Sequence, residues 1–291
     1  MPVGAQGHLG IRKESSFASG GAVDNWQTMN SESLNLTFAN VYSDRIASTP
    51  MQVDGQSGLR AVAGDIVFPV TPSMPSQWLE CGIGQSSSPY YPTRTLSSML
   101  VQIDHETAAV QASGCMVGSL ALASSQGGEL TMTATLEGAG FSSVTAGSPS
   151  YSADAPYLHQ NAVFKLNGTT DTSVTDWNIS IDNNLVTDLY GTDIQRVDIA
   201  AGKAVVSGSF TKLFDDTTER NQFLNAGVRS FWVKFTRGSN YLTVYCPKVL
   251  YDSHTENISG QSDYILETFN FTGYIDDPDS EYSVRVSGDF S

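Results

Sequence analysis

The residue types that could do chemistry are few in this chain and lie far apart. The four histidines fall in a terminal segment, a predicted hairpin turn, a Gly- and Pro-rich span and a loop: His8, His105, His159 and His254. Metal sites need such ligands in a short, regular pattern such as HExxH, and none occurs in the sequence. We therefore interpret all four as surface histidines and expect no metal site.

The three cysteines, Cys81, Cys115 and Cys246, show no CxxC pairing, so neither a disulfide framework nor a zinc knuckle is indicated. We expect three reduced, partly buried thiols. Cys115 falls on a predicted strand without an identifiable base, and the sequence has no GxSxG, no GxxxxGK[ST] and no GxGxxG that opens a helix. No catalytic residue and no cofactor are predicted.

Carboxylates are numerous enough to supply a glycosidase pair, which needs two of them across a cleft. Asp215 and Asp216 are better interpreted as a helix start, and the acidic turn at residues 276–279 as solvated. Asp182-Asn183-Asn184 resembles part of a calcium loop but lacks the DxDxDG spacing. An enzyme is the least favoured interpretation.

The composition favours an all-β protein. The polar residues are mostly Ser, Thr, Asn and Gly, which suit strands and turns. With 30 acidic and 15 basic residues, the formal charge of −15 argues against a surface that grips phosphates. No run of about 20 apolar residues and no secretory signal pattern is present, so we expect a protein made and kept in the cytoplasm until assembly, with no membrane partner.

The chain falls into two halves with the same order of elements. The first half has alternating or apolar strand patterns at residues 34–38, 61–68, 99–104, 109–115 and 130–136. The second half has them at 177–181, 204–210, 231–235, 241–246 and 265–274. One short helix is expected in each half, at residues 76–81, closed by Gly82, and at 217–225. The pattern favours an internal duplication. The alternative is two unrelated β domains whose strands have a similar order and spacing.

These patterns divide the chain into an N-terminal arm (1–30), a first domain (31–138), a linker (139–161), a second domain (162–275) and a C-terminal tail (276–291). The arm, linker and tail lack a clean period but are rich in aromatic residues, which we expect to dock onto a neighbouring molecule: Phe17, Trp26, Tyr151, Tyr157, Tyr282 and Phe290.

Over nearly its whole length the sequence resembles the tail tube (major tail) proteins of siphophages. In the first half the resemblance rests on residues 10–15, 33–36 and 114–122, the last leading through Gly127-Gly128 into residues 130–138. In the second half it rests on residues 180–185 and 206–210, and on Cys246-Pro247 before the closing strand.

The resemblance implies two tandem tube domains of the β-sandwich or barrel type, each with one short helix, and extended arms. It implies a non-enzymatic protein of the virion tail, made in the host cytoplasm, whose rings stack into a tube for the DNA. Most such proteins form hexamers, and two domains per chain would need only three chains. Tape measure, tail terminator and distal tail proteins are the implied partners, with transient, non-specific passage of double-stranded DNA. Acidic residues facing the channel would keep that DNA from sticking.

Two long polar spans, residues 39–59 and 183–202, stand at matching places in the halves, and spans of this length usually have a function. In the resembling proteins the first of them reaches the next ring, so we expect both spans, and residues 1–30, to become ordered only on stacking. The candidate inter-ring contacts are Arg45, Arg196, Asp44 and Asp193, with solvated surface arginines as the alternative for the first two.

The alternative function is another virion or cell-surface β-sandwich, such as a decoration or glycan-binding module. Tryptophans could stack on sugars in such a module. Three of the four tryptophans, Trp78, Trp177 and Trp232, fall on a predicted helix or strand, which favours a core position, and the fourth is Trp26.

Overall fold

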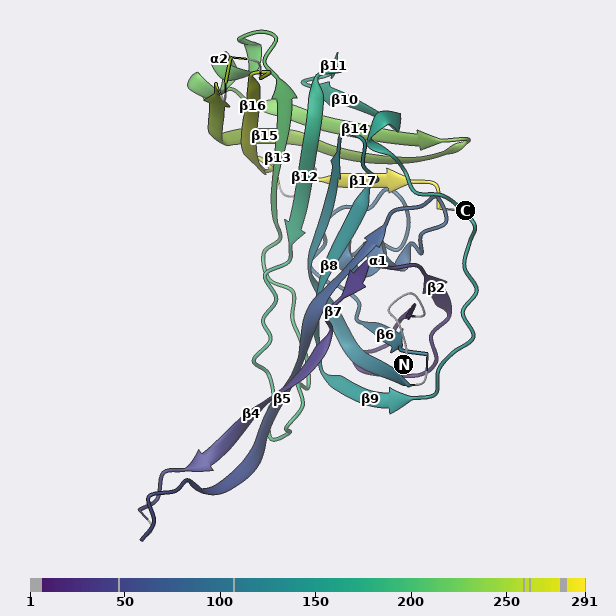
Figure 1. The fold of residues 1–291 in the computed structure, drawn as a ribbon, viewed down its shortest axis with the longest axis vertical. Coiled ribbons are helices and arrows are strands. Elements are labelled where there is room, and N and C mark those ends of the chain that lie inside the picture. The colour runs from purple at the N-terminus through teal and green to yellow at the C-terminus, as the bar shows by residue number, and fades with distance from the viewer. Residues whose placement is uncertain are drawn as a thin grey trace.

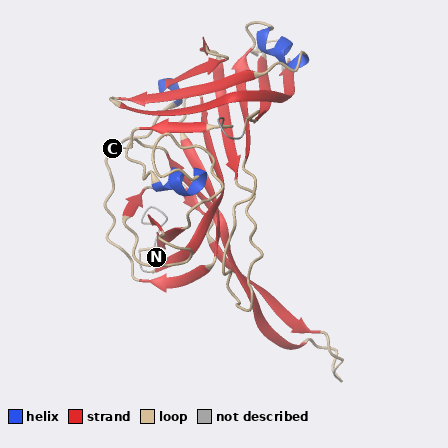
Figure 2. Ribbon diagram, turned by 180° about the vertical axis from the view of Figure 1, so that it is seen from behind, coloured by secondary structure: helices blue, strands red, loops and turns tan. Residues whose placement is uncertain are grey.

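The computed structural model describes residues 7–46, 48–106, 108–258, 260–261, 263–277 and 282–290. The described chain is all-β with two short α-helices, as the composition predicted (Figure 1, Figure 2). The first half contains β1 (His8–Lys13), β2 (Asn25–Gln27), β3 (Ser31–Glu32), β4 (Asn35–Ser43), β5 (Val53–Pro69), α1 (Gln77–Ile83), β6 (Met99–Asp104), β7 (Ala109–Ser125), β8 (Thr131–Gly138) and β9 (Gly140–Val144).

The second half begins with a short 3-10 turn, η2 (His159–Asn161), and ends near the first half. It contains β10 (Ala162–Leu166), β11 (Thr169–Asp171), β12 (Val174–Asp182), β13 (Val205–Leu213), α2 (Thr218–Leu224), β14 (Arg229–Arg237), β15 (Asn240–Asn257), β16 (Leu266–Gly273) and β17 (Arg285–Gly288). All ten strands predicted from alternation lie within or overlap these elements.

Each half is built in two layers that share one long, bent strand. The first part of β7 pairs with β6 and β9, whereas its second part pairs with β8. In the same way β15 pairs first with β14 and β17 and then with β16. A change of layer within one strand needs a local irregularity, and both strands have a register shift there, after Val117 in β7 and after Tyr251 in β15.

The two halves share their main strand pairings; the short β3, which pairs with β5, has no counterpart among the described residues of the second half. In the first half β1 pairs with β2 and β6, β4 with β5, and β5 with β8. The same pairs recur as β10 with β11 and β14, β12 with β13, and β13 with β16. The registers also correspond, because Val62 lies opposite Gly138 in one half and Val206 lies opposite Gly273 in the other.

The halves join edge to edge. Strand β12 pairs antiparallel with the second part of β7, from Asp176 opposite Ser125 to Asp182 opposite Ser119. Asn183 fastens this junction, since its buried side-chain amide donates to the carbonyl oxygens of Gly82 and Val117, each at 2.9 Å. One antiparallel sheet of eight strands therefore runs through the described chain in the order β4, β5, β8, β7, β12, β13, β16, β15.

Both helices form where the sequence predicted them. The first extends to Ile83 and ends at Gly84, whose φ of 109° suits a glycine, so the expected stop at Gly82 was two residues early. Its Trp78 is buried and packs on Phe68, with ring centroids 4.8 Å apart. The second helix starts after Asp216, whose carboxylate accepts the Thr218 N–H at 2.7 Å.

The segments expected to be arms pack largely on their own chain. Strand β1 buries Leu9 and Ile11 against β6, and β17 pairs with β15 and buries Val286. In the linker, β9 pairs with β7, and Tyr157 is fully buried. Docking onto a neighbour is therefore wrong for Tyr157, which is buried in its own chain. Within residues 1–30, β1 and β2 pair with each other and β1 pairs with β6 of the same chain. Residues 1–6 lie outside the described residues.

The thiols follow the prediction, but two of the histidines do not. Cys81, Cys115 and Cys246 are free and buried, and burial raises the pKa of the Cys81 thiol to about 12. His159 is buried and the His254 side chain is only 10% exposed, so the interpretation of these two as surface histidines was wrong. Both lie next to aromatic rings that the linear sequence does not place beside them, Phe164 and Phe269 respectively.

Candidate assembly surface

Strands β4 and β5 extend beyond the body of the molecule as a long two-stranded hairpin (Figure 1, Figure 2). Residues along this projection expose large apolar side chains, and Ile46 is fully exposed. The others are Phe38, Val41, Tyr42, Met51 and Leu59. Apolar side chains gathered on a projection, instead of scattered singly over the surface, are typical of a contact region for another molecule.

The hairpin has a strongly irregular ladder. Register shifts follow Ala39 and Tyr42, which bend and twist the projection. At the first shift Gly58 is required, because a Cβ atom there would lie only 1.6 Å from the carbonyl oxygen of Ala39. Below it, the Arg60 guanidinium covers the Phe38 ring at 5.2 Å. The polar span 39–59 is thus mostly strand and not an irregular loop.

The structure places two of the four predicted contact residues at the tip of this hairpin. Arg45 pairs with Asp54 at 2.6 Å, and 63% of the arginine side chain is exposed. Asp44 is exposed beside it. An exposed pair of this kind contributes little to folding, so both charges are available for exchange with charges of another molecule.

The other two predicted residues lie elsewhere. The span 183–202 runs along the base of β5, where the Ile194 carbonyl accepts the Arg60 N–H at 2.7 Å (Figure 1). Arg196 is only 7% exposed and bonds Glu137 at 2.8 Å, which gives it a role within its own chain. Asp193 is exposed, and its carboxylate accepts the N–H groups of the next two residues.

The eight-stranded sheet ends in two edges with no pairing partner among the described residues. At one end β4 pairs only with β5, and its side chains are exposed along most of its length. At the other end the second part of β15, from Leu250 onward, pairs only with β16. Unpaired backbone N–H and C=O groups on such edges can form a ladder with another chain.

One face of this sheet packs on the core, and the opposite face carries small polar and acidic side chains. Its acidic residues are Asp65, Glu137, Asp176 and Asp182. The remaining positions of β8, β7, β12, β13 and β16 on this face are mostly Thr, Ser, Ala and Asn, with Val205, Leu213 and Leu266 as apolar exceptions, and none of these five strands places Lys or Arg there. Cross-strand hydrogen bonds join several of them, for example Asn178 to Ser209 at 2.6 Å. This surface, here called the polar sheet face, is acidic and without basic side chains on these strands.

A family model for phage tail tube proteins matches residues 4–273. The chain belongs to the phage tail tube protein family. It is a structural component of the virion that assembles into a tube, and it is not an enzyme. A search of curated proteins found no match. Within the described residues, no helix has the length and apolar character needed to cross a membrane.

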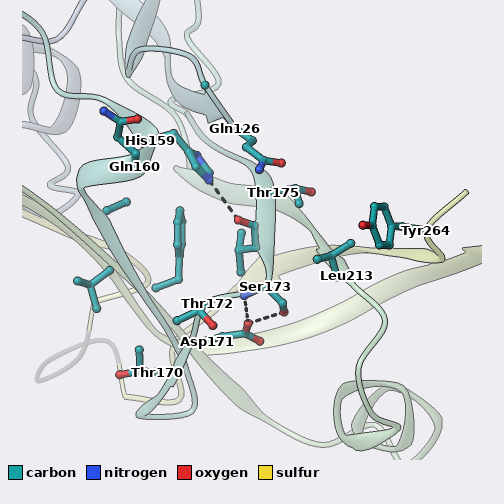
Figure 3. Close-up of a pocket in the computed structure, with 15 residues that line it drawn as sticks. Gln126, His159, Gln160, Thr170, Asp171, Thr172, Ser173, Thr175, Leu213 and Tyr264 are labelled. Atoms are coloured by element: carbon teal, nitrogen blue, oxygen red, sulfur yellow. Dashed lines mark hydrogen bonds between the residues drawn. The ribbon is translucent and has the colours of Figure 1, made fainter.

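A hollow of about 740 Å³ in this tail tube protein lies beside β10, β11 and β12 (Figure 3). His159 faces it, but both ring nitrogens are engaged, Nδ1 with the Ser124 hydroxyl at 2.9 Å and Nε2 with the Val174 carbonyl at 3.2 Å. Trp177 in turn donates to Ser124 at 2.7 Å. Asp171 accepts from Ser173 and binds Lys212. These groups are satisfied by one another, and they connect strands.

Two of the tryptophans weighed for sugar stacking, Trp78 and Trp177, are fully buried. The two sheet edges and the polar sheet face were not among the predicted contacts. The polar face had a sequence signal, because in the strands that form it every second residue is mostly small, polar or acidic and none is basic. The edges had no sequence signal, because the residues of a strand do not show which strands will pair with it.

Proposed function

We propose that this tail tube protein is the duplicated form found in a siphophage, and that three chains close a ring of six tube domains whose channel conducts the DNA. The observation that supports this best is the junction between the halves. It joins the second part of one long bent strand, β7, to the first sheet strand of the next domain, β12. The free edges at the two ends of the sheet are the counterparts of these two strands, β15 and β4.

The same junction can therefore form between chains. If β15 of one chain pairs with β4 of the next, every domain boundary in the ring has one geometry, whether it lies within a chain or between chains. A contact between two different edges repeats head to tail, and it closes into a ring when the rotation permits. Two domains per chain make three chains equivalent to six single-domain subunits.

The matching registers specify the expected contact. Ser119 is the first paired residue after the register shift in β7, and Ser253 holds that position in β15. Asp182 of β12 and Thr37 of β4 are also equivalent positions. Each follows a residue that lies opposite an equivalent valine, Val206 in the second half and Val62 in the first. Because Ser119 lies opposite Asp182 within the chain, we expect Ser253 opposite Thr37 of the next chain.

The polar sheet face supports the assignment of the channel lining. DNA is held by Lys and Arg contacts to its phosphates, and the strands of this face carry acidic residues instead. A lining of this type repels the duplex weakly and gives it no fixed binding site. The projecting β4–β5 hairpin, with Asp44 and Arg45 at its tip, would then contact the next ring of the stack. The tape measure, terminator and distal tail proteins are the proposed partners inside and at the ends of the tube.

Cysteine pairs test the ring directly. Residues directly opposite one another in antiparallel strands have Cβ atoms about 4.5–5.5 Å apart, close enough for a disulfide after small adjustment. In the double variant Thr37→Cys/Ser253→Cys, mild oxidation of assembled tubes should link chains into dimers and closed trimers, with no larger species on a non-reducing gel. The native thiols are buried and should not interfere.

The matched control is Ser119→Cys/Asp182→Cys, the pair that is opposite within the chain. It should form an intramolecular disulfide in both monomers and tubes. Formation of the control bond without any bond between chains in tubes would refute the edge-to-edge junction. A ladder that continues to hexamers would refute the three-chain ring.

A further inference from the structure

Three potential metal ligands meet at the end of the second half that is covered by α2. His254 and Glu256 lie two residues apart on β15, and Glu267 lies opposite Glu256 on β16. The Nε2 atom of His254 is 3.4 Å from a carboxylate oxygen of Glu267. One ligand atom from each of the three side chains lies within 4.8 Å of the other two.

The carboxylate of Glu267 is buried without a hydrogen bond. Its side chain is 1% exposed, and neither oxygen has a hydrogen-bond partner among the described residues; the same holds for Nε2 of His254. The nearest ammonium group, Lys212 Nζ, is 4.0 Å away and is itself bound by Asp171 and Asp215 at 2.9 Å. A buried carboxylate without hydrogen bonds or a close cation destabilises the folded protein, and burial raises the pKa of Glu267 to about 7.

The other two ligands are held in position. The His254 ring is stacked on Phe269, with centroids 4.6 Å apart, and contacts Phe223 of α2 on a second side at 5.8 Å. Glu256 is oriented by Arg220, also from α2, at 3.2 Å. A site of this kind needs little rearrangement to bind an ion, and Glu256, the most exposed of the three ligands, provides the entrance.

The local charges do not balance. Around this point the described side chains include the carboxylates Asp171, Asp215, Glu219, Glu256 and Glu267 and the cations Lys212, Arg220 and Arg229. Five carboxyl groups face three cationic groups, so a divalent cation would stabilise the ionised form of these carboxyl groups.

The fold itself does not require polar residues at these positions. In the first half, the positions that correspond to Glu256 and Glu267 are Leu122 and Met132, which also lie opposite each other. The position that corresponds to His254 is Leu120. All three first-half residues are buried and apolar. The same architecture therefore forms with an ordinary core, and the second half has a polar cluster in its place.

We propose that His254, Glu256 and Glu267 bind one divalent transition-metal ion of the Zn²⁺ class, which fastens the ends of β15 and β16. Two ligands of a tetrahedral ion with bonds of about 2.0–2.1 Å lie roughly 3.4 Å apart. The imidazole favours Zn²⁺ over the oxygen-seeking ions Mg²⁺ and Ca²⁺. The inference depends neither on the ring nor on the number of chains in it.

The test is metal binding by the full chain after removal of metals with a chelator. Titration with Zn²⁺ should give one bound ion per chain, and at a concentration about 100 times its dissociation constant the Tm should rise by roughly 5 °C or more. Mg²⁺ at the same concentration should change nothing. Co²⁺ should give the visible absorption of a low-symmetry, four-coordinate site.

The variant Glu256→Gln alters the most exposed of the three ligands, so it is the variant least prone to misfold, and it should weaken Zn²⁺ binding at least about tenfold. Glu267→Gln should abolish the one-to-one binding. The matched control His105→Gln removes a histidine remote from the cluster and should bind as the unaltered protein does. The proposal would be overturned if Zn²⁺ did not bind, or if it bound equally strongly to Glu256→Gln and to the control. It would also be overturned if Glu267→Gln had a higher Tm than the unaltered protein and Zn²⁺ did not change the Tm of the unaltered protein. Glu267 would then be a protonated carboxyl group.

Discussion

The two halves of the molecule share every main strand pairing but use the span after their first sheet strand in opposite ways. In the first half this span is the β4–β5 hairpin, which leaves the body and exposes apolar side chains. In the second half it folds back. The Ile194 carbonyl accepts the Arg60 N–H at the base of the first hairpin, and Arg196 binds Glu137 of β8 and the Val62 carbonyl of β5. The strand framework tolerates either arrangement, because both spans connect the same two neighbouring strands of the sheet.

Within the described residues, only the span of the first half projects from the body as a hairpin. The second span fills the role of a brace that holds the first hairpin at its base. A difference confined to one connection leaves the core of each half unchanged, so assembly and folding should respond separately to substitutions in the two spans.

Removal of the projecting hairpin should have the largest effect. Residues 40–58 can be replaced by Asn-Gly, because Ala39 and Leu59 lie opposite each other and can be joined by a two-residue turn. We expect a folded protein that forms no tubes in electron micrographs, since the core is not altered. Tubes of normal length from this variant would show that the hairpin does not join rings.

The reciprocal deletion sharpens this result. Replacement of residues 184–201 by a short Gly-containing turn removes the brace, including Arg196 and its contact with Glu137. We expect a measurable loss of thermal stability here, in contrast to the hairpin deletion. Equal stability of the two variants would mean that the packing of the second span on β5 contributes nothing.

Aromatic truncation should separate the core of the second half from the exposed hairpin. Phe210 is buried among Phe231, Phe269 and Phe271, so Phe210→Ala should lower the free energy of unfolding by about 3–5 kcal/mol. Phe38→Ala on the hairpin should cost about 0.5 kcal/mol or less. Urea denaturation of the unassembled chains measures both, and similar costs would contradict the described packing.

Substitution of the two arginines predicted as inter-ring contacts, Arg196 and Arg45, should have smaller and unequal effects on the free energy of unfolding. Arg196→Met leaves the partly buried Glu137 without its partner, and we expect a loss of about 2–4 kcal/mol. Arg45→Met on the exposed pair with Asp54 should change stability by about 0.5 kcal/mol or less, but should reduce tube formation. The double variant Arg196→Met/Glu137→Met should recover part of the first loss; no recovery would show that the ion pair is not its cause.

The smallest effect is expected at the thiols. Because burial raises the pKa of Cys81 to about 12, only about one molecule in ten thousand carries that thiolate at pH 8. Burial also raises the pKa of Cys115 and Cys246. Mass spectrometry after iodoacetamide treatment should show no modification in the native protein and three alkylated sites in denaturant. Fast labelling of one cysteine would locate a loosely packed half.

Much of the framework could be predicted from the sequence, because alternation of apolar and polar residues is a local property. The strand at Met99–Asp104 was predicted with its observed bounds, and both helices were placed within two residues of their observed ends. The buried thiols and the acidic, non-basic composition followed from residue types alone. The family resemblance rested on the same patterns.

Other features depended on contacts between distant segments. The short strands β1 and β17 form only because β6 and β15 offer them an edge, so residues 8–13 and 285–288 could not be distinguished from arms. Arg45 and Arg196 stand in similar polar spans, yet one is exposed and the other is covered by β5 and β8. Burial of a side chain is decided by what packs over it, and that is set by the whole fold, not by the neighbouring residues in the chain.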